Sequence, residues 1–322
     1  MLISAQSSIS TNKFRNEIHL ALQKSPKQLP SKYFYDQKGD ALFQQIMALP
    51  EYYLTERELD IFKSNSGALS DTMLTDGNEF DLIELGAGDA SKSVLLLEEL
   101  QSRNARITYI PIDISGNVLS ILSEKIQSQM PGLDITCIAG EYIDGLKQAV
   151  QMSNRRKVIL FLGSNIGNME PEEAMQFCRE LRNHLQPSDI ILMGFDLKKH
   201  PQTILDAYND KSGITAAFNL NLLSRINSEL NGNFILENFE HYASYDPITG
   251  ACKSYLVSLL KQEVTIDGLN VNFDLNEIIY MELSQKFSIG EIENLAEATG
   301  FRKVSHITNS NGWFVDSFWQ AI

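Results

Sequence analysis

Residues 80–113 read FDLIELGAGDASKSVLLLEELQSRNARITYIPID, and this stretch decides the fold. It opens with a short apolar run over residues 80–83 that leads into a glycine-containing turn. This pattern predicts a buried parallel strand that enters a tight turn. Gly86 and Gly88 carry no Cβ atom, so a ligand can approach the backbone of the turn closely.

The rest of the stretch predicts a helix and then a second strand. An amphipathic helix is expected to begin at Ser91, and a strand over residues 107–112 is expected to end at Asp113. A carboxylate in this place is well positioned to accept hydrogen bonds from both ribose hydroxyls of a nucleoside.

The pattern of glycines limits the kind of nucleoside. A dinucleotide site would require G-x-G-x-x-G, but Ser91 stands at the third glycine position. The remaining pattern, E-x-G-x-G with an acid at the end of the next strand, suits a nucleoside without phosphates. S-adenosylmethionine (SAM) is the commonest cofactor of that kind. An ordinary strand-to-helix turn would explain the glycines alone, whereas Glu84 and Asp113 together favour SAM.

The bulk properties limit the class of protein. The chain has 322 residues, 43% hydrophobic and 21% charged, with a formal net charge of −14. This charge would repel a phosphate backbone, so nucleic acid is not an expected partner. The N-terminus has no apolar signal core, and the apolar runs are too short to span a membrane. Cys137, Cys178 and Cys252 lack metal or redox spacing, so we interpret them as reduced packing residues of a cytoplasmic protein and expect no metal site. We also expect a monomer that acts on a small-molecule substrate.

Strands and helices alternate beyond residue 80. Strands are predicted at 80–85, 107–112, 133–138, 157–162 and 189–195, with helices near 91–101, 115–129, 142–151 and 171–185. This alternation predicts a doubly wound, Rossmann-like α/β sheet of the class I methyltransferase type, which two final strands at 301–307 and 313–319 complete.

Ligands of such sheets bind outside the carboxyl ends of the strands. Besides the glycine turn and Asp113, those ends carry Glu141, Tyr142 and the loop over residues 163–168. Because this loop contains two glycines and two asparagines, we interpret it as part of a site rather than as a simple connection.

The remaining segments predict a second lobe. We assign residues 1–62 and 197–286 to a substrate-binding lobe, and residues 63–196 and 287–322 to the SAM-binding domain. Within the first lobe, residues 1–12 are polar and are expected to lack regular structure, while Thr55 and Glu58 have the spacing of a helix capping box. The tyrosines over residues 33–53 suit either a core or a pocket wall, and the residues alone leave both open.

Several segments resemble the SAM-dependent L-histidine Nα-methyltransferases, which form trimethylhistidine (hercynine) in ergothioneine biosynthesis. The same family includes fungal enzymes of the tryptophan N-methyltransferase type. The resemblance covers nearly the whole chain and is carried by KYFYDQKGDALFQQIMALPEYYLTERE (32–58), ELGAGDASKS (84–93), PIDIS (111–115), FLGSNIGN (161–168), GFDLKK (194–199), DAYNDKSGITAAFNLNLLSRINSEL (206–230) and ELSQKF (282–287).

The resemblance implies an α-amine methyltransferase and assigns roles to matching positions. The residues implied to hold SAM are Gly86, Gly88, Lys92, Asp113, Glu141 and Tyr142. The residues implied to surround the amino acid are Tyr35, Phe43, Tyr52, Asn168 and Tyr208, of which Tyr35, Tyr52 and Asn168 are the expected catalytic residues. Glu282 and Ser284 are implied to hydrogen-bond the imidazole ring, with Ser254 nearby.

Two positions depart from the family pattern. The chain has Glu141-Tyr142 where the family has an aspartate followed by an aromatic residue, and Ser254 where the histidine enzymes have methionine. The second change leaves open a relative that acts on tryptophan, tyrosine or another amine. A third alternative, from another class, is a catalytically silent SAM-binding module, which would have no need of the tyrosine-rich segment or Asn168.

Overall fold

The computed structural model describes residues 3–88 and 90–322, with side chains from residue 12 onward. The chain divides into two compact units. We call Leu54–Lys198 with Gln285–Ile322 the sheet unit, and Met1–Tyr53 with Lys199–Ser284 the insertion unit. The sequence places the first boundary after residue 62, whereas the structural boundary follows Tyr53. The assignment of substrate to one unit and SAM to the other remains a prediction.

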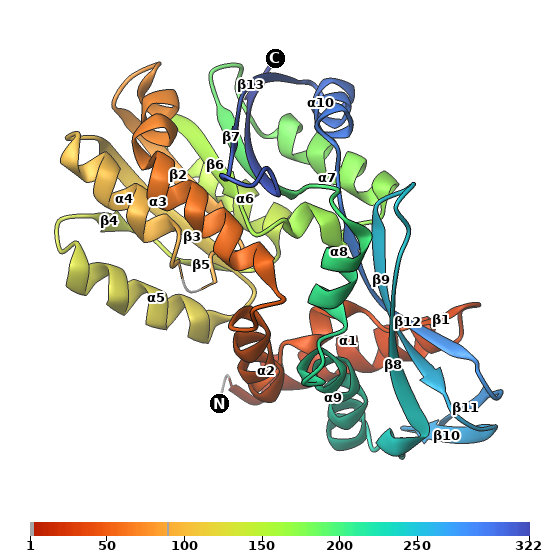
Figure 1. Cartoon of the computed structure of the whole chain (residues 1–322). Coiled ribbons are helices and arrows are strands. Elements are labelled where there is room, and N and C mark those ends of the chain that lie inside the picture. Colours follow the sequence, from red (N-terminus) through yellow and green to blue (C-terminus); the bar gives the residue numbers. More distant parts are fainter. Residues whose placement is uncertain (1–2, 89) are drawn as a thin grey trace. The chain divides into compact units, whose positions relative to one another are not determined.

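The sheet unit is built on a mixed sheet whose strand order is β13-β14-β7-β6-β2-β3-β4, with β5 also paired to β3 (Figure 1). The strands are β2 (Glu79–Leu85), β3 (Arg106–Asp113), β4 (Asp134–Ile135), β5 (Ile138–Ala139), β6 (Arg156–Phe161), β7 (Ile190–Asp196), β13 (Phe301–Thr308) and β14 (Phe314–Ala321). β14 runs antiparallel to both of its neighbours, while β2, β3, β6 and β7 are parallel. The predicted Rossmann-like methyltransferase sheet is therefore confirmed.

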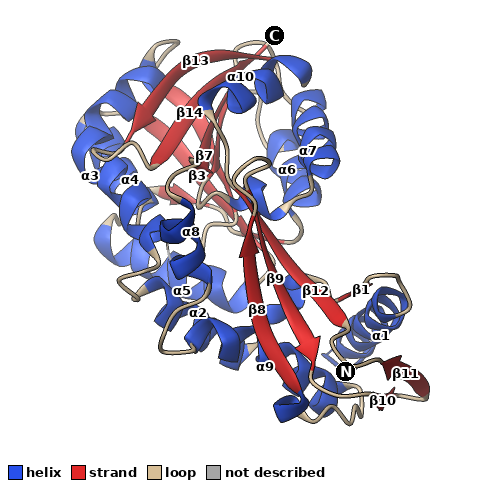
Figure 2. Cartoon of the chain, turned by 45° about the vertical axis from the view of Figure 1, so that its right-hand side comes forward, coloured by secondary structure: helices blue, strands red, loops and turns tan. Residues whose placement is uncertain are grey.

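Helices cover both faces of this sheet (Figures 1 and 2). The helices of the unit are α3 (Tyr53–Leu74), α4 (Ser93–Ser102), α5 (Gly116–Gln129), α6 (Tyr142–Gln151), α7 (Pro171–Asn183) and α10 (Ile289–Ala298), with a 3-10 turn η2 (Asn165–Asn168). One apolar core joins α3, α4 and α5 to the sheet, and a second joins α6, α7 and α10 to it. Because both faces are covered, β2 is buried along nearly its whole length, as the predicted buried parallel strand requires.

The insertion unit contains a mixed sheet, in which one short strand runs parallel to its neighbour, and helices from two distant parts of the chain. Its elements are α1 (Ile3–Leu22), β1 (Lys27–Gln28), η1 (Ser31–Phe34), α2 (Gln37–Met47), α8 (Pro201–Tyr208), α9 (Ile214–Glu229), η3 (Leu236–Asn238), β8 (Phe239–Tyr245), β9 (Ala251–Ser258), β10 (Gln262–Ile266), β11 (Leu269–Phe273) and β12 (Ile278–Gln285). The strands of one sheet lie in the order β1-β12-β9-β8, and β10 pairs with β11 (Figure 2). A third apolar core, which includes Phe34, Phe218 and Leu256, holds this unit together.

Three local predictions are wrong. Helix α1 begins at Ile3, although residues 1–12 were expected to be irregular; no glycine or proline interrupts the helix that Phe14 and Ile18 anchor in the core. The strand expected over residues 133–138 is split into β4 and β5. Helix α3 begins at Tyr53, so Thr55 and Glu58 form no capping box at its start.

Within the described part of the chain, no helix is long and apolar enough to cross a membrane.

Candidate active site

The turn after β2 adopts a backbone conformation that favours glycine. Gly86 and Gly88 have positive φ angles of 75° and 52°. The Gly86 amide donates a hydrogen bond to the Ile112 carbonyl over 2.8 Å, which ties the turn to β3. A Cβ atom on Gly86 would lie 3.2 Å from the Tyr142 hydroxyl oxygen, while one on Gly88 would meet nothing within 4 Å. The turn therefore leaves open space beside Gly88.

Asp113 lies at the end of β3, next to this turn. Its Oδ2 atom accepts a hydrogen bond from the Gly88 amide over 3.2 Å, and its Oδ1 atom accepts one from the Ser115 amide over 2.9 Å. The two backbone donors fix the orientation of the carboxylate. Each carboxylate oxygen retains a further lone pair with which it can accept a hydrogen bond from a ribose hydroxyl.

Glu141 and Tyr142 follow β5, in which Ala139 pairs with Asp113 of β3. Glu141 is exposed at the start of α6, whereas Tyr142 packs edge-on against Phe161, with ring centroids 5.2 Å apart. Burial, assisted by the charge of Asp113, raises the pKa of the Tyr142 hydroxyl to about 12. Tyr142 therefore remains a neutral hydroxyl at the edge of the sheet.

Glu84 supports the turn from within the protein. Its carboxyl group is buried and accepts hydrogen bonds from Ser93 Oγ, over 2.6 Å, and from the Tyr109 hydroxyl. Burial raises the pKa of Glu84 to about 7, although both hydrogen bonds act in the opposite direction. The E-x-G-x-G pattern thus correctly locates the turn. The Glu84 side chain, however, points into the core and not toward the open space beside Gly88.

The loop after β6 brings polar side chains to the same edge. Asn165 Nδ2 would lie 3.3 Å from a Cβ atom on Gly86, so this amide faces the glycine turn. Asn168, one of the three predicted catalytic residues, is the last residue of η2 and is exposed. Sequence reasoning found this loop but singled out Asn168 and passed over Asn165.

Lys92, predicted to hold SAM, forms an ion pair with the buried carboxylate of Glu58. Burial opposes the charged ammonium, but the charge of Glu58 and its hydrogen bond outweigh burial and raise the pKa of Lys92. An ammonium group has three donors, so the pair leaves Lys92 able to bind a further acceptor.

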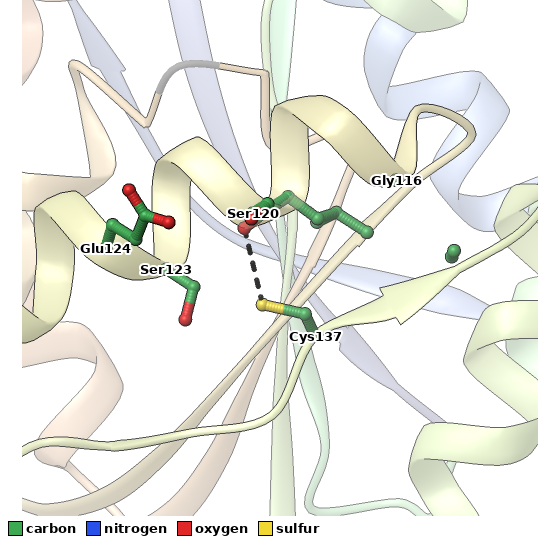
Figure 3. A pocket seen from close by; sticks show the side chains of 7 residues that line it. Gly116, Ser120, Ser123, Glu124 and Cys137 are labelled. Carbon is green, nitrogen blue, oxygen red and sulfur yellow. Dashed lines mark hydrogen bonds between the residues drawn. The ribbon is translucent and has the colours of Figure 1, made fainter.

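A surface hollow of about 380 Å³ lies between α5 and β5 (Figure 3). It is lined by Gly116, Leu119, Ser120, Ser123, Glu124, Cys137 and Ala139. It adjoins Asp113 through Ala139, its partner in the sheet. Within the described part of the chain, none of the six predicted SAM residues lines this hollow, so we place the candidate site at the glycine turn instead.

In the insertion unit, the four aromatic residues predicted to bind substrate form one cluster, whereas Asn168 belongs to the sheet unit. The ring centroids of Tyr35 and Phe43 are 5.6 Å apart, those of Phe43 and Tyr52 are 6.3 Å apart, and those of Tyr52 and Tyr208 are 6.2 Å apart. Phe218 of α9 contacts both Tyr35 and Phe43, at 5.8 and 5.9 Å. Sequence reasoning missed Phe218 because its position in a helix carries no signal that distinguishes it from an ordinary core residue.

The polar residues predicted to bind the imidazole ring lie on strands of the same unit. Ser284 is buried, and its Oγ atom is 2.6 Å from the hydroxyl oxygen of Tyr208, which joins β12 to the aromatic cluster. Glu282 is half-buried, two residues earlier on β12. Ser254 is buried on β9, where it pairs with Ala243 of β8.

Asp210 is buried and His241 is half-buried in the same unit, and the sequence analysis assigned neither of them to the site. Burial lowers the pKa of His241 to about 4, although the charge of Asp210 acts to raise it. Burial acts to raise the pKa of Asp210, but hydrogen bonds, led by Ser212 and Thr215, lower it to about 2. His241 is therefore a neutral imidazole near a carboxylate at neutral pH.

A methyltransferase family model, described as histidine-specific and SAM-dependent, matches residues 14–321. The chain belongs to this family. It is therefore a SAM-dependent methyltransferase, and its cofactor is SAM. The open space beside Gly88, the oriented carboxylate of Asp113 and the neutral hydroxyl of Tyr142 fit such a nucleoside.

Named relatives agree with this membership. The chain is 34% identical to a histidine N-alpha-methyltransferase of Mycobacterium tuberculosis, over 93% of this chain and 92% of the relative. It is 30% identical to the ergothioneine biosynthesis protein 1 of Schizosaccharomyces pombe, over 86% of this chain and 37% of that longer relative. Among solved structures, it is similar to a magnesium protoporphyrin IX methyltransferase of Synechocystis PCC 6803 with bound SAH. That match has a TM-score of 0.46 and 12% identity, over 91% of this chain and 98% of the other.

The buried carboxyl group of Glu84 predicts a pH dependence of folding. Because its pKa is about 7 in the folded protein against 4.5 normally, the folded state binds more protons between these values. The stability that Glu84 contributes is present below pH 4.5 and is lost as the pH rises through 7. We expect the unfolding free energy of the wild type, relative to Glu84→Gln, to fall by about 3 kcal/mol across this window. Urea unfolding at several pH values measures this difference, and a difference independent of pH would contradict the assignment.

Proposed function

We propose that the protein transfers methyl groups from SAM to the α-amino group of L-histidine, up to three times in succession. The observation that carries the proposal is the cluster of Tyr52, Tyr208 and Ser284 in a member of the histidine-specific family. Two relatives that are each 34% identical to this chain are histidine N-alpha-methyltransferases, which supports the same substrate. We further propose a monomer that acts in the cytoplasm, with no nucleic-acid or membrane partner.

The proposed roles divide between the two units. In the sheet unit, Gly86 and Gly88 would admit SAM, Asp113 would accept from its ribose, Lys92 would pair with its carboxylate, and Glu141 and Tyr142 would flank its adenine. Bound SAM supplies a methyl group on a sulfonium, which is an electrophile for an amine. These residues would bind and orient the cofactor.

The substrate amine must be neutral, because an ammonium has no lone pair with which to attack. Tyr52 and Tyr208 carry hydroxyls that can accept or donate a hydrogen bond, and the Asn168 amide has the same capability. Such groups can orient an amine without a strong base. Tyr52 is the residue that we propose as a weak proton acceptor, with Tyr35 assisting.

Each added methyl group removes an N–H donor and adds bulk to the amine. Tyr35 and Phe43 present aromatic rings, and Tyr35 is 41% exposed. Aromatic faces tolerate methyl groups and attract a quaternary ammonium by cation–π contact, which contributes about 0.5–2 kcal/mol. This preference supports a trimethylated product.

Glu282 and Ser284 are proposed to bind the side chain of the substrate. An imidazole offers an N–H donor and a nitrogen acceptor, so a carboxylate and a hydroxyl complement it. Ser254 stands where the histidine enzymes have methionine, and this substitution is the observation that favours a second candidate, an enzyme for another amino acid.

Mass spectrometry after incubation of the protein with SAM and each of the twenty amino acids tests the function. We expect mass gains that correspond to one, two or three methyl groups on histidine alone. Gains on tryptophan, tyrosine or another amino acid would instead support the second candidate. Tight SAM binding with no methylated product would contradict both and indicate a silent binding module.

The side-chain role of Glu282 gives a separate prediction. Loss of one charged hydrogen bond costs about 1.5–3 kcal/mol, so Glu282→Ala should raise the KM for histidine by roughly 10- to 150-fold. The KM for SAM should stay near the wild-type value. Steady-state kinetics with each substrate varied in turn measure both constants, with Glu240→Ala, at an exposed position of β8, as the control. Equal increases in both constants would remove Glu282 from the histidine site.

A further inference from the structure

Three ionisable side chains converge beneath the loop after β6. Glu58 comes from α3, Lys92 from the residue before α4, and Asp316 from β14. The side chains of Glu58 and Asp316 are almost completely buried, with exposed fractions of 1% and 0%. Glu58 accepts hydrogen bonds from the Gly163 amide, at 2.8 Å to Oε1 and 3.0 Å to Oε2, and from Lys92 Nζ. We call Glu58, Lys92 and Asp316 the buried cluster.

The absence of a side chain at Gly194 makes room for the cluster. Gly194 of β7 pairs with Asp316 of β14. A Cβ atom on Gly194 would collide with Glu58 Oε1 and would lie 3.2 Å from Asp316 Oδ1. The carboxyl groups of Glu58 and Asp316 therefore converge on the space that a side chain would fill.

The charges of the cluster do not balance if both acids are ionised. Glu58 and Lys92 satisfy each other as an ion pair. Within the described part of the chain, neither oxygen of Asp316 has a hydrogen-bond donor. A buried carboxylate without a donor is costly, and a second carboxylate beside it adds repulsion.

A protonated Asp316 removes this cost, because its O–H group can donate to Glu58. Burial first, and then the negative charge of Glu58, holds the pKa of Asp316 well above its ordinary value, while Lys92 acts to lower it. Among the described residues, Glu84 also faces the cluster, since its charge acts on Lys92. It adds no positive charge that would favour an ionised Asp316.

We propose that Asp316 is a carboxylic acid that shares its proton with the Glu58 carboxylate, and that this pair positions the loop over residues 163–168 for methyl transfer. The proposal rests on SAM binding at the glycine turn. Glu58, Lys92 and Asp316 would then fix the geometry of the loop in addition to packing in the core. Glu58 and Asp316 are positioning residues, because they act through the Gly163 amide.

The loop needs such an anchor because its backbone is strained. Gly163 and Ser164 both have positive φ angles, of 76° and 57°, and serine adopts this conformation rarely. Glu58 holds the Gly163 amide on one side. On the other side, Ser164 Oγ accepts a hydrogen bond from the Asp196 amide over 3.0 Å. Between them they fix the start of the loop that carries Asn165 and Asn168.

Infrared spectroscopy of the purified protein at neutral pH tests for the shared proton directly. A protonated carboxyl group gives a C=O stretch that an ionised carboxylate lacks. We expect such a band in the wild type, and we expect it to move when aspartate carboxyl carbons are labelled with ¹³C. The labelled band should be absent from Asp316→Asn. A wild-type spectrum without an aspartate-sensitive band would overturn the proposal, and this readout is independent of activity.

Binding of S-adenosylhomocysteine (SAH), measured by isothermal titration calorimetry, tests the positioning role. Asp316→Leu removes the donor to Glu58, and Glu58→Gln removes the charge that holds Lys92. We expect each to weaken SAH binding at least tenfold and to lower kcat. Asp316→Asn, whose amide can donate to Glu58, should recover most of the SAH affinity.

Asp81→Asn is the matched control. Asp81 is equally buried and forms an ion pair with Lys157 over 2.7 Å, near the start of β2 rather than at its glycine end. It should lower stability without changing SAH affinity. Wild-type SAH affinity in Asp316→Leu, or an equal loss in Asp81→Asn, would overturn the positioning role. If the wild type lacked the C=O band of a protonated aspartate but still methylated histidine, the shared proton would be overturned and the proposed function would remain intact.

Discussion

The structure of the cofactor edge depends on the space that Gly86 leaves empty. Its φ angle of 75° lies in a region that residues with a side chain rarely adopt. A Cβ atom on Gly86 would lie 3.2 Å from the Tyr142 hydroxyl oxygen and 3.3 Å from Asn165 Nδ2. The turn after β2, the start of α6 and the loop after β6 therefore lie next to one another in the fold, around Gly86. A backbone turn that is free of side chains, with a carboxylate at the next strand end, is the arrangement that a nucleoside cofactor requires.

Much of this edge could be predicted from residues that are close in sequence. The alternation of apolar strands and amphipathic helices predicted the sheet, and Gly86, Gly88 and Asp113 predicted a glycine turn that lies beside the end of the next strand. These signals are local, because a strand end and its turn are encoded by adjacent residues. The insertion unit gave weaker signals, since its tyrosines suit a core as well as a pocket.

Contacts between distant segments could not be predicted in the same way. Glu58 has the spacing of a capping box with Thr55, yet its carboxylate reaches Gly163, more than one hundred residues away in sequence. Asp316 looks like an ordinary strand residue until β14 is paired with β7 opposite Gly194. Phe218 joins the aromatic cluster only because α9 packs on α2. In each case the deciding partner is set by tertiary packing, which a pattern within one segment does not contain.

The central claim is that the SAM nucleoside binds at the glycine turn through the carboxylate of Asp113. Calorimetric titration of SAH into the wild type and into Asp113→Ala tests it most directly, with Asp144→Ala on the exposed surface of α6 as the control. Loss of two hydrogen bonds to a charged acceptor should weaken SAH binding by about 3 kcal/mol or more, a factor of at least roughly 100. An unchanged affinity in Asp113→Ala would contradict the account.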